Sequence, residues 1–127
     1  MFLGCPFVMD PDVPKDGYIK IENNSNDSIV FAFYLLGKKI DNTDRNYWGN
    51  KYDDSTIPPD TFLLDKFNNS NIKQHLKKGA YTYYLFSLDS VRTIPWERIR
   101  DERIILKEVV FNTWEEMENS NFIITYP

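Results

Sequence analysis

The hydrophobic pattern is clearest in the first third of the chain, where it predicts two β-strands. Residues 18–22 (YIKIE) alternate apolar and polar side chains, the pattern of a strand with one buried face. Residues 29–36 (IVFAFYLL) are apolar on both faces, as expected for a central strand. Between them, residues 23–28 (NNSNDS) favour a turn, because Asn, Asp and Ser side chains bond to nearby backbone groups. We therefore expect the two strands to form a β-hairpin.

The second half of the chain combines further strands with two short helices. Residues 80–88 and 104–111 are rich in aromatic and β-branched residues and predict strands. Pro95 suits the first position of a helix, because it lacks an N–H group that would have no partner there. Thr113 and Glu116 have the spacing of a capping box, which predicts a second short helix.

The chain ends on the sequence NFIITYP, which predicts a final strand over residues 122–126. Phe122, Ile124 and Tyr126 share one face of this strand and are expected to point into the core. Pro127 lacks an N–H group and is expected to end the hydrogen-bonded ladder.

The remaining segments have weaker patterns. Residues 61–64 predict a short strand, residues 68–71 a turn, and residues 72–76 a weak strand or a helical turn. Residues 37–60 predict a loop of a length that is uncommon within a compact domain and is often functional.

Strands dominate the predicted elements, and the helices are short and late. This order favours a mainly β fold: an antiparallel two-layer sheet, similar to a β-sandwich, with two short C-terminal helical segments. A chain of 127 residues is long enough for one domain with a real core. We expect residues 18–127 to form a single β-rich domain. Residues 1–17 contain three prolines and are expected to form an N-terminal leader or tether.

Charge and motifs argue against several classes of function. The net charge of −4 lacks the basic footprint of a nucleic-acid binder. No apolar run approaches the roughly 18–20 residues of a membrane-spanning helix. His75 is the only histidine and lies in a polar, lysine-rich segment, so we expect a solvated surface side chain. No zinc-binding spacing, P-loop or dinucleotide-binding motif occurs. We therefore expect no enzyme activity, catalytic residue, metal or cofactor.

The aspartates of the long loop and the tryptophans that start the helices have simpler interpretations. Oxygen ligands on a loop are suited to calcium, but an EF-hand spacing started at Asp41 would place Thr43 and Arg45 at ligand positions. A solvated acidic loop is the preferred interpretation. Trp96 and Trp114 each start a short helix and are expected to lie in the core.

Aromatic residues in the long loop form the candidate binding site. Tyr47, Trp48 and Tyr52 are predicted to be partly exposed and to form the edge of a shallow recognition surface. Asp53 and Asp54 would supply hydrogen-bond acceptors. A neutral glycan or a basic patch on a protein would suit this surface. In the alternative interpretation, Trp48 folds back to cover a sheet face.

Spaced motifs run along residues 18–127. They read I-x-I-x-N-x-S at 19–25, P-D-T at 59–61, W-x-x-I-R at 96–100, I-L-K at 105–107 and N-F-x-I-x-Y-P at 121–127. In these motifs the chain resembles an uncharacterised family of small Bacteroidetes proteins that end in Asn-Trp/Phe-x-Ile-x-Tyr-Pro. Phe122 replaces the more typical Trp, and Glu108 and Val109 replace the usual Arg-Tyr. The resemblance implies an exported or cell-surface protein of a gut-type bacterium, and it implies no activity.

The single cysteine lies in the sequence F-L-G-C, which resembles the end of a lipoprotein signal. Only four residues precede Cys5, too few for a signal peptide. We therefore predict lipidation of Cys5 on the assumption that the start is truncated, and the alternative is a chance match. Residues 6–17 would then form an extended tether.

These features favour a non-enzymatic envelope protein that acts as a binding or interaction module at the cell surface or in the periplasm. A lipid on Cys5 would attach it to the outer membrane, and its partner would be a protein or a glycan. The alternative is a cytoplasmic accessory or inhibitor-like protein that binds another protein.

Overall fold

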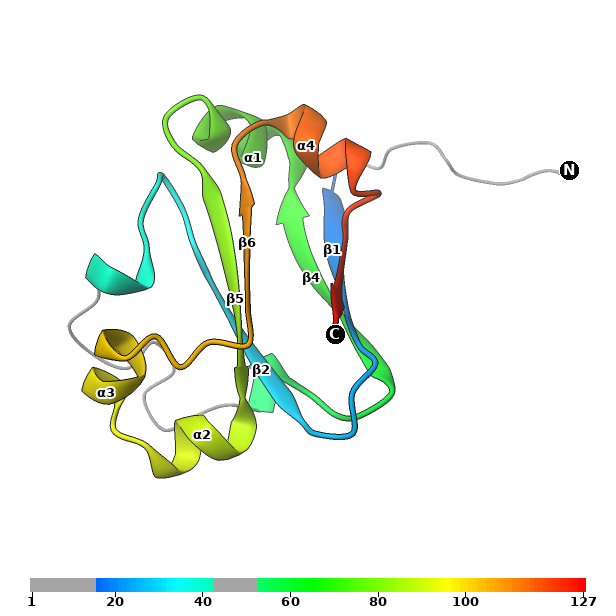
Figure 1. Cartoon of the computed structure of the whole chain (residues 1–127). Helices are drawn as coiled ribbons and strands as arrows, with labels where there is room; N and C mark the ends of the chain where they lie inside the picture. The colour runs from blue at the N-terminus through cyan, green and yellow to red at the C-terminus, as the bar shows by residue number, and fades with distance from the viewer. Residues whose placement is uncertain (1–15, 43–52) are drawn as a thin grey trace, which may run out of the picture.

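The computed structural model describes residues 16–42 and 53–127 (Figure 1). Within these residues, the strands are β1 (Asp16–Asn23), β2 (Ile29–Tyr34), β3 (Thr56–Ile57), β4 (Thr61–Asn68), β5 (Tyr81–Ser87), β6 (Lys107–Phe111) and β7 (Ile123–Tyr126). The helices are α1 (Asn69–Leu76), α2 (Leu88–Thr93), α3 (Trp96–Asp101) and α4 (Trp114–Asn119), with 3-10 turns η2 (Ile40–Asn42) and η3 (Asp53–Ser55). A three-stranded sheet has the order β4-β1-β7, and a four-stranded sheet has the order β3-β2-β5-β6. The predicted mainly β, largely antiparallel two-sheet fold is confirmed.

The main core lies between the two sheets. Ile21 of β1, Phe31 of β2 and Tyr83 of β5 are all buried and belong to one hydrophobic cluster. Helices α1 and α4 lie over one end of the sandwich and add Ile72 and Met117 to the same core (Figure 1). Each large side chain buried in this way contributes about 1.5–3 kcal/mol to stability.

A second core covers the opposite face of the four-stranded sheet. Tyr84 and Phe86 of β5 point to this face, where Val91 of α2 and Trp96 and Ile99 of α3 pack on them. The rings of Phe86 and Trp96 meet edge-on, with centroids 6.1 Å apart. The four-stranded sheet is therefore a middle layer, which explains why β2 and β5 are apolar on both faces. The prediction of central strands there is confirmed, and so is the core position of Trp96.

The predicted hairpin of the first two strands is wrong, although both strands exist. β1 pairs with β4 and β7, whereas β2 pairs with β3 and β5 in the other sheet. Asn23 holds the connection between the layers: its buried amide donates to the carbonyls of Asp27, Ile57 and Pro58. Its side-chain oxygen accepts hydrogen bonds from the backbone and hydroxyl of Ser25. The turn chemistry was identified correctly, but it serves a crossover between sheets.

The final strand lies parallel to the first, with Ile124 beside Ile21 in the register. Ile124 is buried, and Phe122 and Tyr126 pack against the main core, as predicted. Two details differ: Phe122 precedes the strand with a positive φ of 56°, and the β1–β7 pair is not antiparallel. A parallel pair results because α4 carries the chain from one sheet to the other before β7 begins.

The two predicted C-terminal helices are α3 and α4. Pro95 was predicted as the first helical residue of α3, but it is the N-cap, and the helix begins one position later at Trp96. Thr113 caps α4 by accepting a hydrogen bond from the Glu116 backbone, and the Glu116 carboxylate accepts one from the backbone of Asn112. The predicted cap by Thr113 is therefore confirmed, while the Glu116 carboxylate bonds to the residue before the cap. The strand predicted over residues 104–111 is shorter and begins at Lys107.

The middle of the chain is more regular than the pattern predicted. The short strand expected at residues 61–64 continues to Asn68, and most of the expected turn at residues 68–71 belongs to α1. Helix α2 was not predicted. Ser87 caps it by accepting a hydrogen bond from the Ser90 backbone, a local bond that begins the helix directly after β5.

Candidate functional site

Most of the residues predicted to bind a partner lie outside the described residues. This applies to Cys5, Tyr47, Trp48 and Tyr52. Asp53 and Asp54 begin η3 directly before β3, and the Asp54 side chain is exposed. The recognition surface proposed for this loop and the lipidation of Cys5 therefore stay predictions.

His75 differs from the predicted solvated side chain. It lies on α1, is half-buried, and places Nδ1 3.2 Å from the hydroxyl oxygen of Tyr81. Between the two sheets, the Tyr83 hydroxyl of β5 donates to the Asp65 carboxylate of β4 over 2.7 Å. Burial raises the pKa of the Asp65 carboxyl, although the hydrogen bond from Tyr83 opposes this. Burial and the nearby Asp65 charge raise the pKa of Tyr81 to about 12.

These four side chains occupy one end of the interior between the sheets. Their hydrogen bonds satisfy polar groups at the edge of the main core, which is the usual requirement for buried polar atoms. The two pockets described below are lined by other side chains, not by His75, Asp65, Tyr81 or Tyr83. We therefore assign this cluster a structural role.

A groove between α1 and the start of α4 offers a more accessible site. It has a volume of about 390 Å³ and mostly apolar walls. Its lining residues are Lys73, Leu76 and Lys77 from the α1 side and Asn112, Thr113 and Trp114 from the α4 side. Both helices lie at the same end of the sandwich (Figure 1).

Trp114 joins the groove to the core. Its ring packs against Phe122 and Phe67, with centroid separations of 5.3 and 6.2 Å. The side chain is half-buried, so the predicted core position is only partly correct: one part of the indole supports the fold and another lines the groove. A large rigid ring held in this way loses little freedom on binding, which favours Trp as an anchor for a partner.

The rim of the groove is basic. Lys73 lies on α1 and Lys77 directly follows the last residue of that helix, and both side chains line the groove. The Lys73 ammonium lies 4.8 Å from the centroid of the Trp114 ring, a cation–π contact. Among the residues described, no carboxylate forms an ion pair with either lysine. The Glu116 carboxylate accepts a hydrogen bond from the N–H of Asn112, which lies just before α4, so that carboxylate has a partner of its own.

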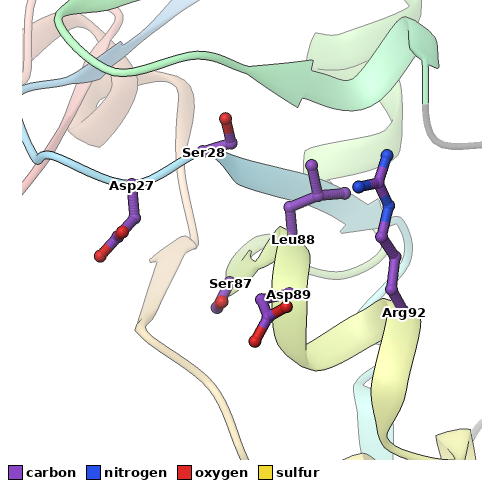
Figure 2. A pocket seen from close by; sticks show the side chains of 6 residues that line it. All are labelled: Asp27, Ser28, Ser87, Leu88, Asp89 and Arg92. Atoms are coloured by element: carbon purple, nitrogen blue, oxygen red, sulfur yellow. The ribbon is translucent and has the colours of Figure 1, made fainter.

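A second, smaller pocket lies where the connection from β1 meets the start of α2 (Figure 2). Its volume is about 170 Å³, and it is lined by Asp27, Ser28, Ser87, Leu88, Asp89 and Arg92. Figure 2 shows the carboxylates of Asp27 and Asp89 pointing away from the guanidinium of Arg92. Because the charged groups do not converge, this pocket provides no common point at which a ligand would be held.

Two further observations concern residues 16–42 and 53–127. Their His, Asp and Glu side chains form no group of three or more that would hold a metal ion. None of their helices has the length and apolar character needed to cross a bilayer.

The molecule is a β-rich two-sheet protein with an aromatic, basic groove at one end. Compared with protein families, curated proteins and solved structures, the chain matches none of them.

Proposed function

We propose that this protein is a non-enzymatic binding module of the cell envelope, and that the groove between α1 and α4 binds an acidic segment of a partner protein. The observation that carries the proposal is the arrangement of Trp114 beside two lysines that have no carboxylate partner among the described residues. The envelope location rests on the resemblance to exported proteins.

The two parts of the groove have different tasks. An exposed lysine–carboxylate pair contributes only about 0.2–1 kcal/mol, so the charges select an acidic partner and speed its approach. Burial of one large apolar side chain contributes about 1.5–3 kcal/mol, so contact with Leu76 and Trp114 supplies most of the affinity. The expected ligand is therefore a peptide segment with one apolar anchor flanked by Asp or Glu.

The sequence also offers the surface around Tyr47, Trp48 and Tyr52, for a neutral glycan or a basic patch on a protein. This surface and the α1–α4 groove share no residue, so the two are separable by mutation. The cytoplasmic alternative uses the same groove for a different partner. Cell fractionation with mass analysis of Cys5 distinguishes the two locations.

The groove is tested by selection from a phage-displayed library of random dodecapeptides on the purified full chain. We expect enrichment of peptides that carry several Asp or Glu residues around one aromatic or aliphatic residue. Lys77→Glu should weaken binding of a selected synthetic peptide by about two- to tenfold in fluorescence polarisation, because it replaces a weak attraction with a repulsion of similar size. Arg92→Glu is the matched control, because it makes the same charge change on α2 at the other end of the sandwich (Figure 1).

Two outcomes would contradict the proposal. One is a selection that enriches no acidic peptide. The other is equal binding by the Lys77→Glu and Arg92→Glu variants, which would place the bound peptide elsewhere on the molecule.

A further inference from the structure

The edge strands of the two sheets differ greatly in length. Within the described residues, β3 has 2 residues, β7 has 4 and β6 has 5, whereas β4 has 8. Short edge strands are one of the means by which proteins prevent further strand pairing. Only one side of β4 is paired, with β1, and no described strand lies on its other side. β4 is therefore the longest open edge described in this molecule.

The outward face of β4 is also unusually apolar. Phe62 is 56% exposed and Leu64 is 45% exposed. The Lys20 ammonium lies 4.5 Å from the centroid of the Phe62 ring and covers part of it. An open edge that carries exposed apolar side chains favours pairing with another strand.

The sequence of β4 is complementary to itself when two copies run antiparallel. With Leu63 opposite Leu63 of a second copy, Phe62 faces Leu64 and Asp60 faces Lys66. Each of these pairs is apolar with apolar or negative with positive, the combinations that stabilise cross-strand neighbours. Because the two copies are related by a two-fold axis through Leu63, each of these two pairs occurs twice in the interface.

Neighbouring registers that keep the outward faces on the same side are less favourable. Centring the pair on Leu64 places Phe62 opposite Lys66 and Leu63 opposite Asp65. Centring it on Asp65 places two carboxylates opposite each other, and like charges in that position destabilise the pair. Charge and apolar contact thus favour the register centred on Leu63 over these two.

We propose that two copies of this chain associate through β4, antiparallel and centred on Leu63, to form one continuous six-stranded sheet. Phe62 and Leu64 of both copies then form one apolar patch across the joint. This interface is separate from the α1–α4 groove, and it leaves the short strands β3, β6 and β7 as the described open edges of the assembly.

The association is tested by sedimentation equilibrium of the full chain over a wide range of concentration. We expect a monomer–dimer equilibrium that Leu64→Lys weakens at least tenfold. Val110→Lys is the matched control: Val110 is also an exposed apolar residue, 37% accessible, on the edge strand β6. A chain that stays monomeric at millimolar concentration overturns the proposal, and so does a dimer that is weakened by Val110→Lys and not by Leu64→Lys.

The register is tested by cross-linking in a Cys5→Ser background, which leaves the introduced thiol as the only one. Directly opposed antiparallel residues have Cα atoms about 4.5–5.5 Å apart, within the range a disulfide spans. Leu63→Cys should therefore form a disulfide-linked dimer under mild oxidation, faster than Leu64→Cys. The reverse order overturns the register.

A charge exchange keeps the register testable if Leu63→Cys fails to fold. Lys66→Asp should weaken the dimer because it places two acidic side chains opposite each other. Adding Asp60→Lys should restore it. Failure of the double variant to recover association, with the monomer fold intact by circular dichroism, overturns the proposed pairing.

Discussion

The two sheets bury their strands to different degrees, and the difference is visible in their sequences. The four-stranded sheet has a core on each face, and its central strands β2 and β5 are apolar along nearly their whole length. Only the inner face of the three-stranded sheet packs on a core. Along β1, the side chains of Ile19 and Ile21 therefore point inward, and those of Lys20 and Glu22 point outward. Strand composition therefore identifies the layer to which a strand belongs, even where it does not identify its neighbour.

The largest expected effect tests how far the three-stranded sheet depends on its last strand. Removing residues 122–127 deletes Phe122, Ile124 and Tyr126 from the main core, a loss of about 4–9 kcal/mol. This is a large share of a typical stability of about 5–15 kcal/mol. We expect no cooperative thermal transition in near-UV circular dichroism. Removing Pro127 alone is the control, and a truncated chain that melts like the full one would contradict the assigned role of β7.

The next effect compares the same residue type in the two sheets. Phe86 is fully buried in the second core, and Phe62 is 56% exposed on the outer face. Phe86→Ala should lower the free energy of unfolding by about 3–5 kcal/mol through lost burial and a cavity. Phe62→Ala should cost less than about 1 kcal/mol, mainly its contact with Lys20. Urea unfolding of both variants measures the difference, and equal losses would be incompatible with a solvent-facing outer sheet.

A smaller effect is expected at the crossover between the sheets. Asn23→Ala leaves the carbonyls of Asp27, Ile57 and Pro58 without their side-chain donor, at a cost of about 1–3 kcal/mol. Asn24→Ala is the control, because Asn24 is exposed and contributes its backbone N–H to Tyr126. Denaturant midpoints compare the two variants. A loss at Asn24 as large as that at Asn23 would show that the side-chain amide does not hold the layers together.

The smallest effect concerns the polar edge of the main core. Because burial raises the pKa of Asp65 in the folded state, its protonation favours folding at low pH, and this contribution is lost as pH rises through the folded pKa. Asp65→Asn keeps a hydrogen-bond acceptor for Tyr83 but cannot ionise. The melting temperature of the variant relative to the unmodified chain should therefore rise between about pH 3 and pH 7. If the melting temperature of the variant relative to the unmodified chain instead falls over this range, folding favours the ionised form of Asp65.

The sequence predicts the strands better than their partners because periodicity is local and pairing is not. The strands at β1, β2 and β5 follow from side-chain patterns over a few residues. The hairpin was wrong because nothing within residues 18–36 shows that β1 pairs with β4 and β7. The parallel β1–β7 pair likewise depends on the path of α4.

The groove was missed for a related reason. The placement of Lys73 and Lys77 beside one groove can be predicted only once α1 is known to be a helix. Residues 72–76 also fitted a weak strand. Trp114 was predicted as core because it follows a helix cap, but packing on Phe67 and Phe122 leaves part of its ring facing the groove. The contact between α1 and α4 brings these residues together, and no local sequence pattern predicts that contact.

The position of β7 also sets the order in which the molecule is completed on the ribosome. Glu22 and its neighbour Thr125 are 103 residues apart in the chain. At about 5–20 residues per second, translation needs about 5–20 s to cover that interval. β4 is synthesised before β7 and pairs with one side of β1, while the other side stays open until residues 123–126 emerge. The nascent chain therefore carries a vacant strand position beside β1 throughout that interval.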